Sequence, residues 1–300
     1  MDELLWIASL LASTLRIATP LLFAAMAGFF SERAGIVDIG LEGKMLMAAF
    51  AAAAAAAVTG SPWIGLAAAV VSSCLLALLH GYATITQRGD QVISGVAINL
   101  LAPGLTVLLA NAWFELGRET PALSGTQRFQ PILGVPMLVY AAYLAVPLAW
   151  WLAYRTRFGL RLRAVGENPE AAETAGVRVA AVRYRAVLLA GLLCGFAGAY
   201  LAIAQGNQFQ AGMTAGKGYL ALAALIVGKW RPVPTLLACL MFAAADALQA
   251  RLQGAPILGI AVPVQLIEAL PYLITVLLLA GFLGRAIPPK AIGKPYPAER

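Results

Sequence analysis

The sequence is poor in the side chains that carry out most enzyme chemistry. It has one histidine, His80, and three cysteines, Cys74, Cys194 and Cys239, which lie in apolar segments without paired or metal-like spacing. A single histidine excludes a histidine-based triad and a metal cluster built from several histidines. We therefore expect the cysteines to be small packing residues, and we do not expect this chain to be an enzyme or to bind a cofactor or metal.

Charged residues are also scarce, and this scarcity sets the class of protein. Only 12% of the 300 residues are charged, 61% are hydrophobic, and the mean hydropathy is +0.81. These values lie outside the range of soluble globular domains. The composition predicts an all-α polytopic membrane protein. The first residues, MDELLW, are acidic and precede a long apolar run, so a cleaved signal peptide is not expected.

Apolar segments of spanning length predict about nine transmembrane helices, within a range of eight to ten, in a single domain over residues 1–300. The segments are Leu4–Phe30, Met45–Thr59, Trp63–Thr86, Val92–Trp113, Pro136–Tyr154, Ala186–Ala204, Gly218–Trp230, Pro232–Ala250 and Gln265–Leu283. Met45–Thr59 and Gly218–Trp230 are short for a full crossing. Their length predicts broken or half helices beside irregular backbone.

The basic residues predict the orientation, because Lys and Arg collect in cytoplasmic loops. Seven arginines lie in residues 155–185, so this loop is expected to be cytoplasmic. Counting crossings outward adds nine more basic residues to that side, or 16, and leaves four outside, Arg118, Arg128, Lys217 and Arg251. The N-terminus is then outside and the tail 285–300 is cytoplasmic. The net charge of +7 reflects this topology and an anionic inner leaflet, not nucleic-acid binding.

The cytoplasmic loop contains GENPEAAETAG, residues 166–176, which predicts a short helix. Asn168 is placed to be the N-cap, Pro169 to occupy the first position and Gly176 to end the helix. Such a helix can dock into a groove on a cytoplasmic partner or lie on lipid headgroups, and the pattern alone leaves both open. The candidate coupling residues are Gly166, Glu167, Asn168, Pro169, Glu170, Ala171, Ala172, Glu173 and Gly176.

Residues 31–49, SERAGIVDIGLEGKMLMAA, form a polar, glycine-broken stretch with five charged residues between two apolar segments. This stretch must stay near the membrane without being a plain helix. Gly43-Lys44 and Gly216-Lys217 form a weak internal repeat, here called the echo. Each pair starts an apolar segment, and the two segments run in opposite directions. The echo favours a path built from two halves.

Polar groups within apolar segments mark where a solute could be handled. Asn99 lies in mid-segment near Pro103, where its amide could meet polar groups of a solute, or could instead bond a neighbouring helix. Asp246 could line an outer vestibule or pair with Arg251. Arg16, near the middle of the first segment, predicts a paired side chain or a shifted span.

The outer stretch from Gln205 to Gly218 is rich in amides and broken by glycine. Irregular backbone at membrane depth is tolerated where it lines a cavity, so this stretch is a candidate pore mouth or gate, although a plain outer loop is the alternative. The candidate path residues are Asn99, Gln205, Asn207, Phe209, Met213 and Asp246.

A resemblance to a known family rests on four motifs, which occur along the chain in the order SERAGIVDIGLEGKMLMAA, QVISGVAINLLAPGLT, RAVGENPEAAETAGV and MTAGKGYLALAALIVGKWRP. The chain resembles the membrane permeases of ATP-binding-cassette (ABC) importers, and within them the nucleoside branch related to ribose and branched-chain amino-acid permeases. The resemblance covers about Pro20 to Leu252 and implies a type II importer-like bundle in the cytoplasmic (inner) membrane. It also implies that residues 166–176 form the coupling helix on a cytoplasmic ATPase. Further partners implied are a second permease, expected to be non-identical, an extracytoplasmic solute-binding lipoprotein, and membrane lipids.

ATP must be bound by another chain if this resemblance holds. The nearest match to a phosphate loop, Gly212–Gly218, has three residues between its first two glycines where four are needed, and a glycine in place of the Mg²⁺-binding Ser or Thr. An uncharged solute, with nucleosides first and simple sugars such as ribose second, suits the few charged groups in the membrane segments. A secondary transporter or channel would need membrane carboxylates, for which Asp246 and Glu268 give thin support.

Overall fold

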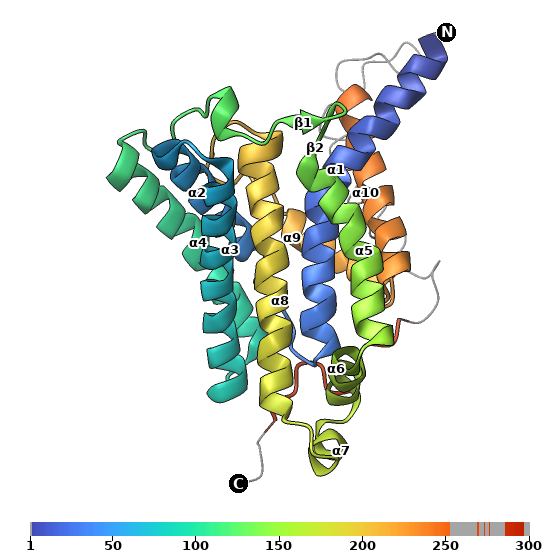
Figure 1. Cartoon of the computed structure of the whole chain (residues 1–300). Coiled ribbons are helices and arrows are strands. Elements are labelled where there is room, and N and C mark those ends of the chain that lie inside the picture. The colour runs from blue at the N-terminus through green and yellow to red at the C-terminus, as the bar shows by residue number, and fades with distance from the viewer. Residues whose placement is uncertain (1, 253–268, 270–272, 274–275, 277–285, 297–300) are drawn as a thin grey trace.

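Helices form nearly all the regular structure in the part of the chain that the computed structural model describes, which is residues 2–252, 269, 273, 276 and 286–296 (Figure 1). The elements are α1 (Asp2–Arg33), α2 (Leu41–Thr59), α3 (Pro62–Gly81), η1 (Tyr82–Thr86), α4 (Gln91–Phe114), η2 (Gly125–Gln127), β1 (Pro131–Ile132), β2 (Val135–Pro136), α5 (Met137–Arg155), α6 (Arg157–Glu167), α7 (Pro169–Thr174), α8 (Val179–Ala199), η3 (Tyr200–Gln205), α9 (Lys217–Val227) and α10 (Pro232–Leu252). The expected all-α membrane bundle is confirmed.

Seven helical segments within the described residues are long and apolar enough to cross a membrane. The eighth apolar helix, α9, has only 11 residues, so the prediction of a short helix there is confirmed. The prediction was wrong for Met45–Thr59, because α2 begins at Leu41 and its 19 residues are long enough to cross. Of the ninth predicted segment, Gln265–Leu283, the structure describes only residues 269, 273 and 276, and Glu268 lies outside the described residues.

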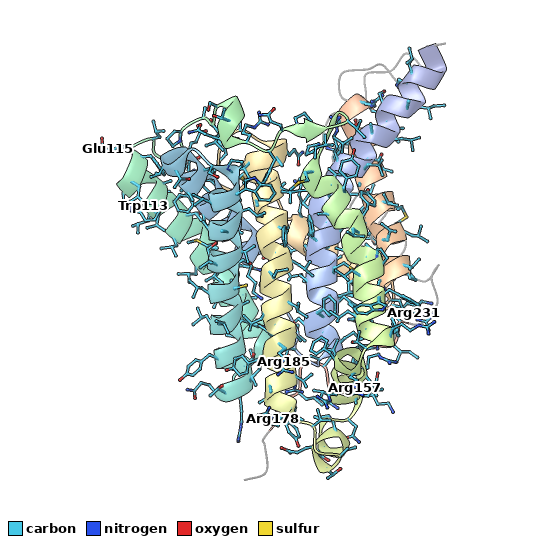
Figure 2. The ribbon with its side chains drawn as sticks, in the orientation of Figure 1. Trp113, Glu115, Arg157, Arg178, Arg185 and Arg231 are labelled. Atoms are coloured by element: carbon cyan, nitrogen blue, oxygen red, sulfur yellow. The ribbon has the colours of Figure 1, made fainter. Side chains whose placement is uncertain are left out.

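The bundle has two distinct ends (Figure 1). Helices α6 and α7 lie at one end, here called the α7 end, together with residues 286–296. The chain's N-terminus and the hairpin of β1 and β2 lie at the other, here called the hairpin end. Arg157, Arg178, Arg185 and Arg231 gather at the α7 end, whereas Glu115 lies at the hairpin end (Figure 2). The arginine-rich loop therefore lies at one end of the bundle.

Helix α8 occupies the centre and packs against α1, α2 and α3. Three glycines on α8 allow this close approach. A Cβ added to Gly198 would lie 2.4 Å from the Met45 carbonyl oxygen, and one added to Gly195 would lie 2.6 Å from the Cα of Val70. Gly191 is similarly close to Ala77. Small residues at helix interfaces let backbones meet in this way.

Helix α1 explains how Arg16 is accommodated. Its 32 residues extend for about 48 Å, well beyond a hydrocarbon core of about 30 Å. The Arg16 side chain is exposed and donates a hydrogen bond to the Gly134 carbonyl at the hairpin end. The apolar span Leu5–Arg33 still includes Arg16, and its hydrogen bond is to a backbone carbonyl, so the shifted span expected for this residue stays a prediction. The hairpin itself was not predicted, and its two-residue turn has positive φ at Leu133 and Gly134, as tight hairpins require.

Candidate substrate path and coupling surface

The first turns of α2 and α9 meet at one carboxylate. Glu42, in the first turn of α2, accepts hydrogen bonds from the backbone amides of Gly216 (2.8 Å) and Gly218 (2.6 Å), which begin α9. From this point α2 runs toward the hairpin end, and α9 leads to the turn before α10 at the α7 end (Figure 1). Two helix N-termini, each the positive end of a helix dipole, are thus held together by one negative charge.

Asn99 of α4 completes the contact from a third helix. Its side-chain oxygen accepts the Gly43 amide (2.8 Å), and its side-chain nitrogen donates to the Ile39 carbonyl (2.9 Å) and to the Tyr219 hydroxyl (2.8 Å). We call Glu42, Asn99, Gly216, Gly218 and Tyr219 the break cluster. The interhelical hydrogen bond expected as one of two roles for Asn99 is present.

The break cluster lies deep along α4 and is partly open. Asn99 is about 12 Å of helix rise from the start of α4 at Gln91, in a helix of 24 residues. Pro103 has no amide hydrogen for the Asn99 carbonyl four residues earlier, so this backbone acceptor has no helical donor. Asn99 is half-buried, and Tyr219 is 48% exposed. Uncharged donors and acceptors therefore reach an accessible surface at mid-helix.

Glycines bring the three helices close enough for these bonds. A Cβ on Gly218 would lie 2.5 Å from the Glu42 amide nitrogen, and one on Gly43 would lie 2.6 Å from the Ile98 carbonyl oxygen. Gly95 similarly faces Gly40 across the α4 and α2 contact. No larger residue fits at Gly218 or Gly43 without moving backbone. Gly43 and Gly218 therefore allow the close approach of α2 to α4 and of α9 to α2.

The polar stretch before α2 is held by buried side chains. Residues 34–40 are not helical, as expected, and Lys44 pairs with Asp38 at 2.6 Å with both side chains fully buried. His80 bonds the Val37 carbonyl, and Gln91 accepts the Val37 amide. Burial acts to raise the pKa of the Asp38 carboxyl, but the Lys44 and His80 charges and hydrogen bonds outweigh it, so the pKa lies below its ordinary value. The stretch is therefore a fixed connection between α1 and α2.

The other candidate path residues lie nearer the hairpin end. Gln205 and Asn207 are exposed, and Met213 is half-buried where the segment turns toward α9. The backbone here is tied to the loop that follows α4, since the Asn207 carbonyl accepts the Leu123 amide. Phe209 is fully buried and meets Phe50 edge to face at 5.3 Å between ring centroids, so it packs the interior.

Asp246 does not pair with Arg251. Arg251 donates instead to the Ser9 hydroxyl (2.8 Å) and the Trp6 carbonyl, and its guanidinium lies over the Trp6 ring. The salt bridge considered for Asp246 is thus wrong. Asp246 is half-buried on α10, and Lys217 is the opposite charge that acts on it.

The predicted short helix is present as α7. The Asn168 side chain accepts the Ala171 amide as an N-cap, Pro169 takes the first position, and Gly176 has φ +80° just beyond the end. Ala172 is buried against the bundle. The Tyr296 hydroxyl donates to Glu173 on the inner side. The outward residues Glu167, Asn168, Glu170, Ala171, Thr174 and Gly176 are exposed, so α7 presents a free edge.

Helix α6 was not predicted, and it joins α7 to the bundle. A Cβ on Gly166 would lie 2.1 Å from the Arg33 carbonyl oxygen, so α6 abuts the end of α1. Residues 286–296 fill the space between: the Ala291 amide donates to the Gly166 carbonyl, and the Gly293 amide donates to the Gly35 carbonyl. Contacts thus run from α7 through α6 and the tail into the stretch that leads to the break cluster.

The relationship to known proteins can now be stated. The sequence profile described as the branched-chain amino acid transport system / permease component matches residues 10–281. The chain belongs to this permease family. It is an ABC transporter permease and not a catalytic subunit, and it is a multi-pass membrane protein.

The permease is similar over its length to transporters of two solute classes. It is 38% identical to the nucleoside ABC transporter permease protein NupC of Lactococcus lactis subsp. cremoris, with 96% of each chain covered. It is 37% identical to the guanosine ABC transporter permease protein NupQ of Bacillus subtilis, covering 99% of this chain and 98% of the relative. It is 36% identical to TsgC13 of Haloferax volcanii, to which glucose transport is ascribed, with 91% of each covered.

The architecture also matches a solved structure. A protein described as an inward-facing conformation of an ABC transporter, ascribed to the metal-chelate type, aligns with a TM-score of 0.50 over 89% of this chain and 85% of that chain. At 15% identity the match shows the fold alone, and it places the permease among type II importer-like bundles.

Two residues of the break cluster were missed from the sequence. Glu42 was noted only as a charge in a polar stretch, and the position that corresponds to it before Gly216-Lys217 is Ala215, so the repeat did not indicate it. Nothing in the sequence indicated a role for Tyr219, since a tyrosine near the start of an apolar helix is common. The sequence feature that indicated this part of the structure was the amide of Asn99 within an apolar segment.

Proposed function

We propose that this permease carries nucleosides across the cytoplasmic membrane as part of an ABC importer. The observation that carries the proposal is the full-length similarity to two nucleoside permeases, one of them named for guanosine. The chemistry of the break cluster agrees with it. Asn99 and Tyr219 offer uncharged donors and acceptors, which suit the base edges and hydroxyls of a neutral nucleoside.

In this proposal the break cluster lines the path of the solute. Asn99 and Tyr219 contact the solute directly, and Glu42 keeps the two helix starts in register around it. Gln205, Asn207 and Met213 lie along the approach from the outer side, and Asp246 lies beside Lys217 at the start of α9. Discontinuous helices that begin at mid-depth are a recurrent way to expose backbone and polar groups to a transported solute.

The α7 end is proposed to face the cytoplasm, because it carries the arginine-rich loop. Helix α7 then docks on a separate ATPase, which binds and hydrolyses the ATP. Movement of α7 reaches residues 31–44 through the Gly166 and Arg33 contact and through the tail at Ala291 and Gly293. This connection would shift α2 relative to α9 and so open the path alternately to each side.

A second, non-identical permease and an extracytoplasmic solute-binding lipoprotein complete the proposed importer. The binding protein supplies affinity, so few intramembrane contacts are needed. Broad apolar faces on α3, α4 and α5 remain exposed to lipid or to the second permease. The C-terminus is proposed to be cytoplasmic, since residues 286–296 lie at the α7 end (Figure 1).

Simple sugars are the second candidate solute, and the similarity to TsgC13 is the observation that favours them. Uptake of labelled guanosine by cells with and without the gene separates the two. Gene-dependent uptake that excess ribose and glucose leave unchanged supports nucleosides. Uptake abolished by either sugar assigns the path to sugars, and uptake that survives ATP depletion contradicts an ABC importer.

A further inference from the structure

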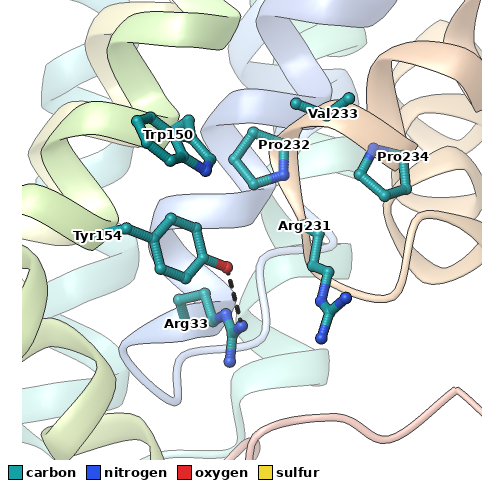
Figure 3. A pocket seen from close by; sticks show the side chains of 7 residues that line it. All are labelled: Arg33, Trp150, Tyr154, Arg231, Pro232, Val233 and Pro234. Atoms are coloured by element: carbon teal, nitrogen blue, oxygen red, sulfur yellow. Dashed lines mark hydrogen bonds between the residues drawn. The ribbon is translucent and has the colours of Figure 1, made fainter.

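A pocket of about 370 Å³ opens at the α7 end of the bundle (Figure 3). Three separate parts of the chain form its walls. Arg33 comes from the last turn of α1, Trp150 and Tyr154 come from the last turns of α5, and Arg231 to Pro234 come from the start of α10. The function proposed above uses neither the pocket nor Arg231.

The pocket is cationic. The Arg33 guanidinium is held by the Trp230 carbonyl (3.2 Å) and the Tyr154 hydroxyl (3.3 Å), and it faces the cavity with Arg231 (Figure 3). The ion pair found for it among the described residues is with Glu167, at 3.9 Å and half exposed, which compensates the charge only weakly. Arg231 is exposed, and no hydrogen bond or ion pair of its side chain occurs among the described residues. Two positive charges thus face one cavity.

The remaining walls are aromatic and apolar. Trp150 is 40% exposed, and the Arg155 guanidinium lies over its ring at 5.6 Å. Val233 of α10 is half exposed, and Leu237, one turn further along the same face, is 62% exposed. A phospholipid at the bilayer surface presents its phosphate first and its acyl chains deeper in the membrane. The pocket follows the same order, with an arginine pair at a helix end, a tryptophan beside it and an apolar helix face beyond.

We propose that this pocket binds the phosphate of an anionic phospholipid, with its acyl chains along the exposed face of α10. The two guanidiniums contact the phosphate oxygens, because arginine forms charge-assisted hydrogen bonds with phosphate. Cytoplasmic leaflets are anionic, and basic pockets between helices on that side suit such headgroups. The site holds the ends of α1 and α5 against the start of α10, one turn from the α9 segment.

Lipid retention measured by native mass spectrometry of the full-length permease in mild detergent tests the site. The probes are phosphatidylglycerol and phosphatidylcholine with identical chains. Arg231→Gln is the main variant, because Arg231 is exposed and its loss should not unfold the bundle. Arg185→Gln is the matched control, since Arg185 is an exposed arginine at the same end but outside the pocket.

The wild-type protein and Arg185→Gln are expected to retain phosphatidylglycerol in preference to phosphatidylcholine. Arg231→Gln should weaken phosphatidylglycerol binding by about tenfold, the effect of one charge-assisted hydrogen bond. Equal retention of the two lipids by the wild type, or an equal loss in both variants, would overturn the site. Displacement of the lipid by millimolar inorganic phosphate would overturn the lipid assignment and leave a free-phosphate site. None of these results depends on which solute is transported.

Discussion

The carboxylate of Glu42 accepts the backbone amide of Gly218 at 2.6 Å, and this bond joins the first turn of α2 to the first turn of α9. The two helices lead away from the bond toward opposite ends of the bundle (Figure 1). A charged acceptor at two helix N-termini is stronger than a neutral one. The bond is therefore the point at which a relative movement of α2 and α9 would be controlled.

Replacement of this charge should impair transport more than folding. Glu42→Gln keeps the size but loses the charge and has a single acceptor oxygen, so it can keep only one of the two bonds to Gly216 and Gly218 and turns its NH2 group toward the other amide, which should cost about 1–3 kcal/mol. We expect the permease to be inserted at normal levels and its uptake rate to fall severalfold. Uptake normalised to the amount of permease in the membrane measures this. Wild-type uptake by Glu42→Gln would show that the charge is dispensable.

Loss of the Tyr219 hydroxyl separates a path role from a packing role. Tyr219→Phe removes the bond to Asn99 but keeps the ring, and the side chain is 48% exposed. The KM for uptake should rise about two- to tenfold, the effect of one hydrogen bond, with little change in thermal stability. Tyr140→Phe is the control, because Tyr140 is similarly exposed and bonds the Ile132 carbonyl at the hairpin end. Equal effects of both substitutions would remove Tyr219 from the path.

The buried pair of Asp38 and Lys44 should matter for stability. Asp38→Asn leaves the Lys44 charge unpaired where both side chains are fully buried, which should lower the free energy of unfolding by about 3–5 kcal/mol. Thermal unfolding in detergent measures the loss. Replacing Asp38 and Lys44 together by Asn and Met should recover a large part of it, and failure to do so would show that the charge pair is not the cause.

The same pair predicts a pH dependence. The pKa of Asp38 is lower in the folded protein than the usual 3.8, so its stabilisation is complete above that value and is lost as the pH falls through the folded pKa. The difference in melting temperature between the wild type and Asp38→Asn should thus stay constant from about pH 8 to pH 5 and narrow only below about pH 4. A difference that already changes between about pH 8 and pH 5 would contradict Asp38 as the titrating group.

Gly166 should be essential for coupling. An alanine there would place its Cβ 2.1 Å from the Arg33 carbonyl oxygen, so α6 must move away from α1. We expect Gly166→Ala to leave ATPase activity in the assembled importer while the uptake per ATP hydrolysed falls to a small fraction. Gly104→Ala is the control, because nothing lies within 4 Å of its added Cβ and alanine favours a helix by about 0.5–1 kcal/mol. Normal uptake by Gly166→Ala would exclude this route of coupling.

The sequence predicted the helices well where length and apolarity decide. The short α9 and the caps of α7 followed from spacing and from Asn168, Pro169 and Gly176. The start of α2 was misplaced because Glu42 and Lys44 look like loop residues until Gly216, Gly218 and Asp38 supply their partners. Such pairings join residues up to 176 positions apart, and no local pattern records them.

Helix α6 was missed for a related reason. Its buried positions, Gly159, Leu162, Val165 and Gly166, are spaced for one helix face, but four of its 11 residues are charged and three of these are arginines, which is typical of a loop between membrane segments. Its tight seat against Arg33 depends on tertiary contact. Asn99 was the one side chain of the break cluster that the sequence indicated, because an amide in an apolar segment needs a partner.

The most direct test of the account is ATP-driven guanosine uptake into proteoliposomes that contain the complete importer, compared for the wild-type permease and Tyr219→Phe. The account predicts uptake that requires ATP, that excess ribose or glucose does not reduce, and whose KM rises in Tyr219→Phe. Guanosine uptake that is absent, that is blocked by sugar, or that proceeds at the same rate without ATP would contradict it.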